Sequence, residues 1–265
     1  MLKIENLTKI FAKGTINEMT ALDGVNFHGA SGDFITIIGS NGAGKSTLMN
    51  SIAGVFPVDS GKIVLDGKDM SDMPEHKRAK MIGRVFQDPL KGTAFDMTIE
   101  ENLSIAYNKK RRRGLQAGIS RSDRELFKEK LALLGMGLED RMKEKVRLLS
   151  GGQRQALTLF MAVIAEPKLL LLDEHTAALD PLTAEKVLKI TKDIVEERKI
   201  TTLMITHNMA SSLRLGNRTI LMDSGSVAID LKGEEREHMD VEGLLRLYHK
   251  IKGQEFDNDR ILLAN

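Results

Sequence analysis

Residues 39–46, with the sequence GSNGAGKS, have the residue types and spacing of a phosphate-binding loop. They fit the pattern G-x-x-x-x-G-K-[ST], in which glycines let the backbone curl until successive N–H groups point at phosphate oxygens. The Lys45 ammonium is expected to reach the β- and γ-phosphates of a nucleotide, and the Ser46 hydroxyl to ligate Mg²⁺. The residues expected to contact the nucleotide here are Gly39, Ser40, Asn41, Gly42, Ala43, Gly44, Lys45, Ser46 and Thr47. On its own, the pattern predicts binding of a nucleoside triphosphate and does not separate a kinase, a GTPase and a transport ATPase.

Two carboxylates, Asp173 and Glu174, follow the four consecutive leucines of residues 169–172. Ligands of open parallel sheets bind at the carboxyl ends of the strands, so we expect this pair near the phosphate-binding loop. Asp173 would hold Mg²⁺, through water, and Glu174 would orient the attacking water or take its proton. The alternative is a surface acidic pair that ends a strand, and the loop at residues 39–46 argues against it.

A second anion site is predicted at Ser150, Gly151, Gly152 and Gln153, which precede the apolar segment 156–165. The Ser150 hydroxyl and the two glycine amides are expected to cap a helix that runs through that segment. Since the chain already has one phosphate-binding loop, a separate γ-phosphate site makes sense if it serves the nucleotide of a neighbouring chain.

The elements that would carry these groups alternate between strand and helix. Residues 34–38 form an apolar, β-branched run that ends at Gly39, which suits a strand buried on both faces. A helix is expected from Lys45 to about Ala53, and further strands at 63–65, 84–86, 169–172 and 201–206. This alternation predicts a largely parallel sheet. A short helix at 74–81, shorter strands at 3–7 and 25–27, and a hairpin turn at 223–225 complete the pattern.

The remaining chain divides into a helical insertion and a C-terminal segment. We expect a single domain at 1–240, with a helical subdomain inserted at about 87–166, and an amphipathic helix and tail at 241–265. The apolar residues of that helix fall at helical spacing: Leu244, Leu247, Tyr248 and Ile251. They are expected to pack on the core, with a regulatory or dimer contact as the alternative. The basic run at 109–113 is interpreted as a solvated loop, with contact to anionic lipid or a partner as the alternative.

Composition limits the functional classes further. The chain has 265 residues, no cysteine, 42% apolar residues and a formal net charge of +2. Disulfides and thiolate metal sites are therefore excluded, and the charge does not predict nucleic-acid binding. We expect no signal peptide, and no apolar stretch approaches the roughly 20 residues that span a bilayer. If the protein works at a membrane, another chain is expected to provide the passage.

Leu149–Gln153, with the sequence LSGGQ, closely resembles the signature of the ATP-binding-cassette (ABC) ATPases, and Ser150 lies 23 residues before Asp173. The resemblance extends over about residues 2–235. It implies an α/β fold, a P-loop ABC ATPase core with a mostly parallel sheet, an N-terminal antiparallel β subdomain and the inserted helical subdomain. It also implies a head-to-tail pair of chains with two ATP molecules between them.

The resemblance assigns roles to four further residues. Phe11 stands at the position of the aromatic residue that stacks on adenine, where family members often have Tyr. Gln87 matches the glutamine that senses Mg²⁺ and water and links to the helical subdomain. Asp180 belongs to the loop that crosses the dimer interface and is expected to take part in ATP binding there, and His207 matches the histidine that contacts the γ-phosphate.

One position departs from the family pattern. His175 follows Glu174 where the family usually has Pro, so the residue regains a backbone N–H and loses a fixed φ. We expect the fold and hydrolysis to survive, because both carboxylates stay in place. The alternatives for an added effect are a more mobile loop and a titratable group near the nucleotide. The segment 173–180, DEHTAALD, looks like a bacterial importer branch found beside a lipoprotein-type binding protein and a small permease, for which aromatic amino acids are among the proposed substrates.

The resemblance therefore implies the ATP-hydrolysing subunit of a membrane transporter, peripheral to the cytoplasmic face of a bacterial membrane. Its expected partners are a second ABC subunit, transmembrane permease subunits and an extracytoplasmic solute-binding protein, with a small solute such as an amino acid as cargo. The alternative is a soluble, non-transport ABC ATPase, for example of the iron–sulfur-assembly type. A phosphate-loop kinase would leave Ser150–Gln153 and His207 unexplained.

Overall fold

The computed structural model describes residues 1–107 and 118–252, which form two compact units. The first comprises Met1–Ala79 and the chain from Arg198 onward, and the second comprises Lys80–Glu197. The basic run at 109–113, the tail after residue 252 and the side chain of Ile251 lie outside the described residues. No helix within the described ranges is both long and apolar enough to cross a membrane.

The first unit contains the antiparallel sheet predicted for the N-terminal region. Its strand order is β2–β1–β4–β5, with bounds Met19–Gly29, Leu2–Phe11, Ser60–Leu65 and Lys68–Asp69. The strands predicted at 3–7, 25–27 and 63–65 are parts of β1, β2 and β4. Leu2 and Ile4 of β1 are buried, as the alternation of their sequence predicts. Leu7 is buried as well, after a register shift between Ile4 and Leu7 that interrupts the alternation.

A second group of strands in the same unit supports the phosphate-binding loop. β3 (Phe34–Ile38) lies between β8 (Thr201–Ile205) and β9 (Arg218–Asp223) and pairs in parallel with both. All five residues of β3 are buried, as predicted for a strand covered on both faces. β10 (Ser226–Lys232) runs antiparallel to β9 after a tight turn, which confirms the hairpin predicted at residues 223–225.

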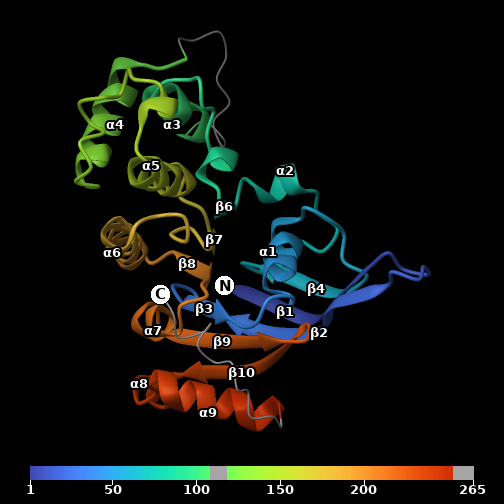
Figure 1. Ribbon diagram of the computed structural model, residues 1–265. Helices are drawn as coiled ribbons and strands as arrows, with labels where there is room; N and C mark the ends of the chain where they lie inside the picture. The colour runs from blue at the N-terminus through green and yellow to red at the C-terminus, as the bar shows by residue number, and fades with distance from the viewer. Residues whose placement is uncertain (108–117, 253–265) are drawn as a thin grey trace. The chain divides into compact units, whose positions relative to one another are not determined.

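Helices of the first unit flank these strands (Figure 1). α1 spans Lys45–Ala53, as predicted, whereas α2 spans only Glu75–Arg78 and is shorter than the helix predicted at 74–81. The chain straightens beyond α2 because β6 of the second unit begins at Ile82. α7 (Met209–Arg214) and α8 (Gly233–Glu237) are short, and α9 spans Val241–Lys252.

The C-terminal helix α9 packs on the strands of its own unit (Figure 1). Leu244, Leu245 and Tyr248 are buried in one apolar cluster with residues of β3, α7, β9 and β10. The packing role predicted for this helix is therefore confirmed for its described side chains, and Leu247 is partly buried beside the cluster.

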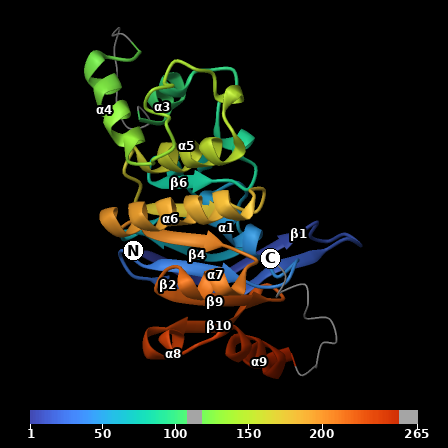
Figure 2. The same ribbon diagram turned by 60° about the vertical axis from the view of Figure 1, so that its left-hand side comes forward.

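The second unit combines a parallel strand pair with helices (Figure 2). β6 (Ile82–Val85) pairs with β7 (Leu169–Asp173), and the helices are α3 (Ile99–Tyr107), α4 (Arg121–Ala132), α5 (Gly151–Val163) and α6 (Pro181–Arg198). Short 3₁₀ turns span Pro89–Gly92 and Val146–Leu148. A Cβ atom at Gly83 would lie 2.4 Å from the carbonyl oxygen of Ala162, so α5 packs directly against the backbone of β6.

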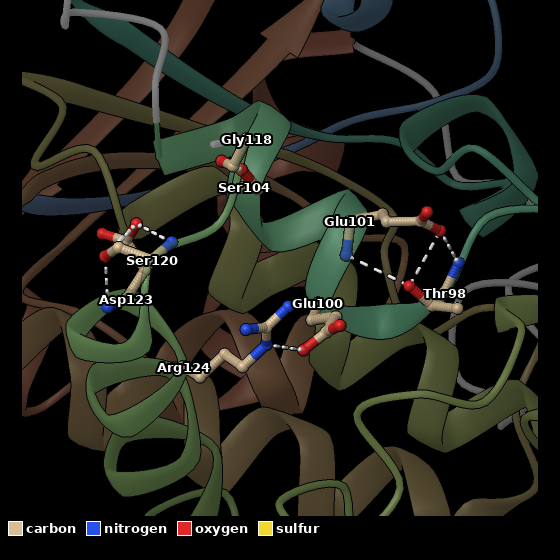
Figure 3. A network of polar contacts seen from close by, with 8 residues as sticks. All are labelled: Thr98, Glu100, Glu101, Ser104, Gly118, Ser120, Asp123 and Arg124. Atoms are coloured by element: carbon tan, nitrogen blue, oxygen red, sulfur yellow. Dashed lines mark hydrogen bonds and ion pairs between the residues drawn. The ribbon is translucent and has the colours of Figure 1, made fainter. Parts of the chain in front are cut away.

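Polar contacts hold α3 and α4 together (Figure 3). The Arg124 Nε atom of α4 lies 2.9 Å from a carboxylate oxygen of Glu100, a residue of α3 that is only 8% exposed. Ser104 of α3 donates a 2.8 Å hydrogen bond to the carbonyl oxygen of Gly118, which precedes α4. Ser120 and Asp123 form a reciprocal capping box at the start of α4.

Candidate nucleotide-binding site

The loop that follows β3 has a backbone that only glycine fits at two positions. Gly39 has a φ of 148° and Gly44 a φ of 96°. A Cβ atom would lie 2.2 Å from the carbonyl oxygen of Met222 at the first position, and 2.5 Å from that of Ala21 at the second. Both distances are far shorter than any real contact of a Cβ atom. Glycine is therefore required at both positions, because neighbouring backbone lies too close for a side chain and because the φ angles are positive.

The turn between β9 and β10 braces this loop. Gly225 donates its backbone N–H to the carbonyl oxygen of Ala43 at 3.2 Å, and accepts at its own carbonyl a 2.9 Å hydrogen bond from the Asp23 N–H. The Ala43 N–H closes the loop on itself by donating to the carbonyl oxygen of Ser40 at 3.2 Å. Gly225 is thus a supporting residue that the sequence motif did not reveal, although its glycine turn was visible.

The start of α1 offers positive charge and backbone donors. Its N-cap residue is Gly44, no side chain caps it, and its first turn has no acidic residue. The Lys45 side chain is 6% exposed, and its ammonium donates to the carbonyl oxygens of Gly39 at 2.8 Å and Ser40 at 2.9 Å. Ser46 is exposed beside it. A phosphate anion fits this donor set, because a helix N-terminus and an ammonium both stabilise negative charge.

His207 lies at the same sheet edge as the loop. β3 and β8 are parallel, with Ile37 paired to Ile205, and the Thr206 N–H donates to the carbonyl oxygen of Ile37 at 3.2 Å. Gly39 lies two residues after Ile37, and His207 lies two residues after Ile205. The structure therefore brings the predicted histidine beside the strand that carries the loop. The His207 side chain is exposed.

Phe11 ends β1 with a partly exposed ring. It packs edge-to-face on Phe56, with 5.3 Å between the ring centroids and an interplanar angle of 82°. The Lys9 ammonium lies 5.5 Å from the centroid of the Phe11 ring. The ring is held by neighbours in its own unit, and its stacking on adenine stays a prediction.

In the second unit, the structure brings Gln87 and Glu174 together. They follow β6 and β7, which are parallel neighbours with Val85 paired to Leu172. The Gln87 amide donates a 3.3 Å hydrogen bond to a carboxylate oxygen of Glu174. Glu174 also has a φ of 46°, a left-handed conformation that is uncommon for a residue with a Cβ atom.

Asp173, the last residue of β7, is partly buried. Within the described ranges, no three His, Asp or Glu side chains are grouped as a ready-made metal site. Mg²⁺ commonly binds with one or two protein ligands and completes its coordination with water and nucleotide phosphates. Ser46 and Asp173 each carry a hard oxygen donor of the type that Mg²⁺ prefers, and their binding of one ion stays a prediction.

His175 is buried. It is 2% exposed, and its Nε2 atom lies 3.0 Å from the Thr191 hydroxyl on α6. Burial lowers the pKa of His175 from 6.5 to about 4, because it disfavours the charged imidazolium. The packing of this side chain under α6 therefore favours the neutral ring, and the predicted nearness of His175 to the nucleotide stays a prediction.

Acid is expected to destabilise the nucleotide-free protein through His175. The unfolded chain takes up this proton near pH 6.5 and the folded chain only near pH 4, so stability is complete above pH 6.5 and is lost as pH falls to 4. The difference corresponds to about 3 kcal/mol. His175→Gln should flatten the pH dependence of the free energy of unfolding by that amount, measured with urea between pH 7 and pH 4. His76→Gln, at an exposed site on α2, should keep the wild-type slope, and parallel curves for wild type and His175→Gln would contradict the assignment.

The predicted second anion site has the helix cap that its sequence indicates. Ser150 accepts at Oγ a 3.3 Å hydrogen bond from the Gln153 N–H, and Gln153 accepts at Oε1 a 3.2 Å hydrogen bond from the Ser150 N–H. A Cβ atom at Gly152 would lie 2.1 Å from the Thr183 Cγ2 atom of α6. The start of α5 therefore packs closely on the start of α6, and a larger residue at this position would require the Thr183 side chain to move.

Arg141 supports this cap and was not found from the sequence. Its Nη1 atom donates to Gln153 Oε1 at 3.1 Å, and its guanidinium contacts the Glu144 carboxylate at 2.6 and 2.9 Å. Gln153 also donates from Nε2 to the carbonyl oxygen of Met136 at 3.1 Å. The contacts join residues that follow no local pattern, so spacing alone could not have indicated them.

Asp180 begins α6 as a helix cap. Its carboxylate accepts a 3.1 Å hydrogen bond from the Thr183 N–H, and hydrogen bonds from Thr183 hold the pKa of Asp180 below its usual value. The cap orders the start of α6 within the second unit. The predicted role of Asp180 in nucleotide binding stays a prediction.

Comparison with known proteins agrees with the fold and with the motifs. Residues 22–177 match the family model described as ABC transporter. The chain is 43% identical to a tyrosine transport ATP-binding protein of Clostridioides difficile, over 94% of this chain and 98% of the relative. It is 33% identical to the energy-coupling factor transporter ATP-binding protein EcfA2 of Clostridium tetani, over 86% of this chain and 78% of the relative.

Solved structures give the same result. A dimeric ATP-binding cassette in a post-hydrolysis state, with ADP and phosphate bound, is 31% identical and superposes with a TM-score of 0.74, covering 88% of this chain and 98% of that one. The cbiO1 component of the cbiONQ ABC transporter complex from Clostridium perfringens is 27% identical with a TM-score of 0.74, covering 98% of this chain and 96% of that one. The chain belongs to the ABC transporter family, as one of its ATP-binding, ATP-hydrolysing subunits.

Proposed function

We propose that this chain is the ATPase subunit of an importer for a small solute such as an amino acid. One chain contains both a phosphate-binding loop and a separately capped site at Ser150–Gln153. This observation carries the proposal that two copies of the chain pair. Two copies arranged head to tail would each complete the nucleotide site of the other. The dimeric cassette with bound ADP and phosphate supports this arrangement.

The nucleotide chemistry is proposed to divide among named groups. Lys45 and the amides of the loop bind the phosphates of ATP, and Ser150 with the glycine amides beside it contacts the γ-phosphate held by the partner. Glu174, hydrogen-bonded to the Gln87 amide, orients the attacking water and accepts its proton. His207 donates to the γ-phosphate. Mg²⁺, held by Ser46 and Asp173, would neutralise charge on the phosphate oxygens.

The cargo and partners rest on the relatives. The relative matched over 98% of its length is a tyrosine transport protein, and another relative, from Corynebacterium jeikeium, is a methionine import protein with 36% identity over 58% of its length. These support amino-acid import, with permease subunits in a bacterial membrane and a solute-binding protein outside it. The chain would then lie at the cytoplasmic face, where ATP is available.

The test is capture of partners from source membranes. Tagged Glu174→Gln chain, incubated with ATP and Mg²⁺, is used to pull down proteins from detergent-solubilised membranes, which are identified by mass spectrometry. Lys45→Met is the matched control, because it should not form the ATP-dependent pair. A permease with several membrane spans, enriched over the control, supports the proposal. Reproducible capture of a soluble partner without any membrane protein would instead support the non-transport ABC ATPase.

A further inference from the structure

The backbone at Glu174 is held in a conformation that costs free energy. A φ of 46° is disfavoured on a residue with a Cβ atom, because the side chain crowds the backbone in this left-handed region. One local hydrogen bond, from the Ala177 N–H to the carbonyl oxygen of Glu174 at 3.0 Å, closes the turn that follows. A conformation of this kind persists only where the surrounding structure enforces it.

His175, the next residue, ties this turn to α6. Its Nε2 atom lies 3.0 Å from the Thr191 hydroxyl, and Thr191 is 1% exposed. The single proton of that hydroxyl is donated to the carbonyl oxygen of Val187 at 2.8 Å. Nε2 therefore carries a proton and donates it to Thr191, which fixes the tautomer of the neutral ring.

The other ring nitrogen shows that stability alone does not account for an imidazole here. Nδ1 is buried and has no hydrogen-bond partner among the described residues. A buried acceptor without a hydrogen bond lowers the stability of the folded state, and an apolar side chain of similar size would avoid this loss. In return, the imidazole forms one directed hydrogen bond to α6, and this bond fixes the direction of the turn after β7.

We propose that His175 is a positioning residue for Glu174. Its hydrogen bond to Thr191 anchors the turn to α6, holds the neighbouring residue in its left-handed conformation, and so sets where the carboxylate points. The inference rests on the proposed role of Glu174 in hydrolysis. His175 itself contacts neither nucleotide nor water in this mechanism.

Two pairs of substitutions separate positioning from packing. In His175→Gln the side-chain amide nitrogen takes the place of Nε2, whereas in His175→Asn it takes the place of Nδ1 and does not reach Thr191. Thr191→Ser keeps the hydroxyl, and Thr191→Val removes it from a side chain of the same shape. Thermal melting establishes that each variant is folded, and the threonine pair carries the test if an exchange at His175 prevents folding.

The expected result is a loss in turnover without a loss in binding. His175→Asn and Thr191→Val should each lower kcat for ATP about 10- to 100-fold, the effect of misplacing a reacting group by about 1 Å, with KM within about twofold of wild type. His175→Gln and Thr191→Ser should keep kcat within about threefold. The double variant His175→Asn/Thr191→Val should be no slower than the slower single variant, because both break one interaction.

Equal kcat values for the Gln and Asn variants, or a loss confined to KM, would overturn the inference. Glu174→Gln is assayed beside these variants, so that failure of the positioning inference can be told apart from failure of the proposed function. If Glu174→Gln is inactive and His175→Asn is fully active, only the positioning role is wrong. If Glu174→Gln turns over at the wild-type rate, the assigned role of Glu174 falls, and the positioning role with it.

Discussion

Glu174→Gln is expected to lower kcat for ATP hydrolysis about 100- to 10,000-fold, the contribution of a positioned general base. Glutamine has the same shape, and its carbonyl oxygen can still accept the hydrogen bond that the Gln87 amide donates to Glu174. It cannot take a proton from the attacking water. The bound ATP would therefore persist, and two chains should remain associated around it. Phosphate release gives the rate, and size-exclusion chromatography with light scattering gives the association state.

Glu197→Gln provides the matched control. Glu197 is an exposed glutamate on α6 of the same unit, so the exchange removes one negative charge without touching Gln87 or the turn after β7. It should hydrolyse ATP at the wild-type rate and dissociate after turnover. Normal turnover by Glu174→Gln would show that another group activates the water.

Lys45→Met is expected to weaken ATP binding about 10- to 100-fold. Hydrogen bonds to a charged group contribute about 1.5 to 3 kcal/mol, and each 1.4 kcal/mol changes the dissociation constant about tenfold. Methionine keeps much of the apolar stem of a side chain that is 6% exposed, so the change isolates the ammonium. Titration with a fluorescent ATP analogue gives the dissociation constant, and circular dichroism establishes that the fold is retained.

Lys68→Met removes the same charge from an exposed position on β5 of the same unit and should bind ATP as the wild type does. If Lys45→Met binds ATP normally, the loop holds the nucleotide by its backbone amides and α1 alone. Loss of binding in both variants would point to overall charge instead of a local contact.

Local patterns account for the features of the fold and the site that could be predicted from the sequence. The run at 34–38, the glycine-rich loop and the start of α1 follow one another in sequence, so spacing alone defines β3, the loop and the helix. Ser150 and Gln153 form the capping box that their three-residue spacing indicates. The alternation of β1 was visible only over residues 3–7, although the strand runs from Leu2 to Phe11. Register shifts in its pairing with β2, the first of them between Ile4 and Leu7, break the period of two along the rest of the strand.

Contacts between distant segments account for the features of the site that could not be predicted from the sequence. The burial of His175 depends on α6, whose Thr191 lies 16 residues further along the chain. The support of Gln153 by Arg141 and the brace from Gly225 to Ala43 likewise join residues without a shared pattern. In each case the residue type permits several environments, and tertiary packing selects one.

The central position of β3 has a consequence for the newly made chain. Among the strands of residues 1–107 and 118–252, β3 pairs with β8 and β9 alone. The hydroxyls of Thr36 and Thr219 lie 2.9 Å apart and are separated by 183 residues of sequence. At ribosomal rates of about 5 to 20 residues per second, the strand waits roughly 10 to 40 seconds for these partners. During that interval its apolar residues have no sheet to enter, so we expect the nascent chain to need protection from association. A ribosome-bound chain that ends before β9 should be unable to retain ATP, however complete its glycine-rich loop.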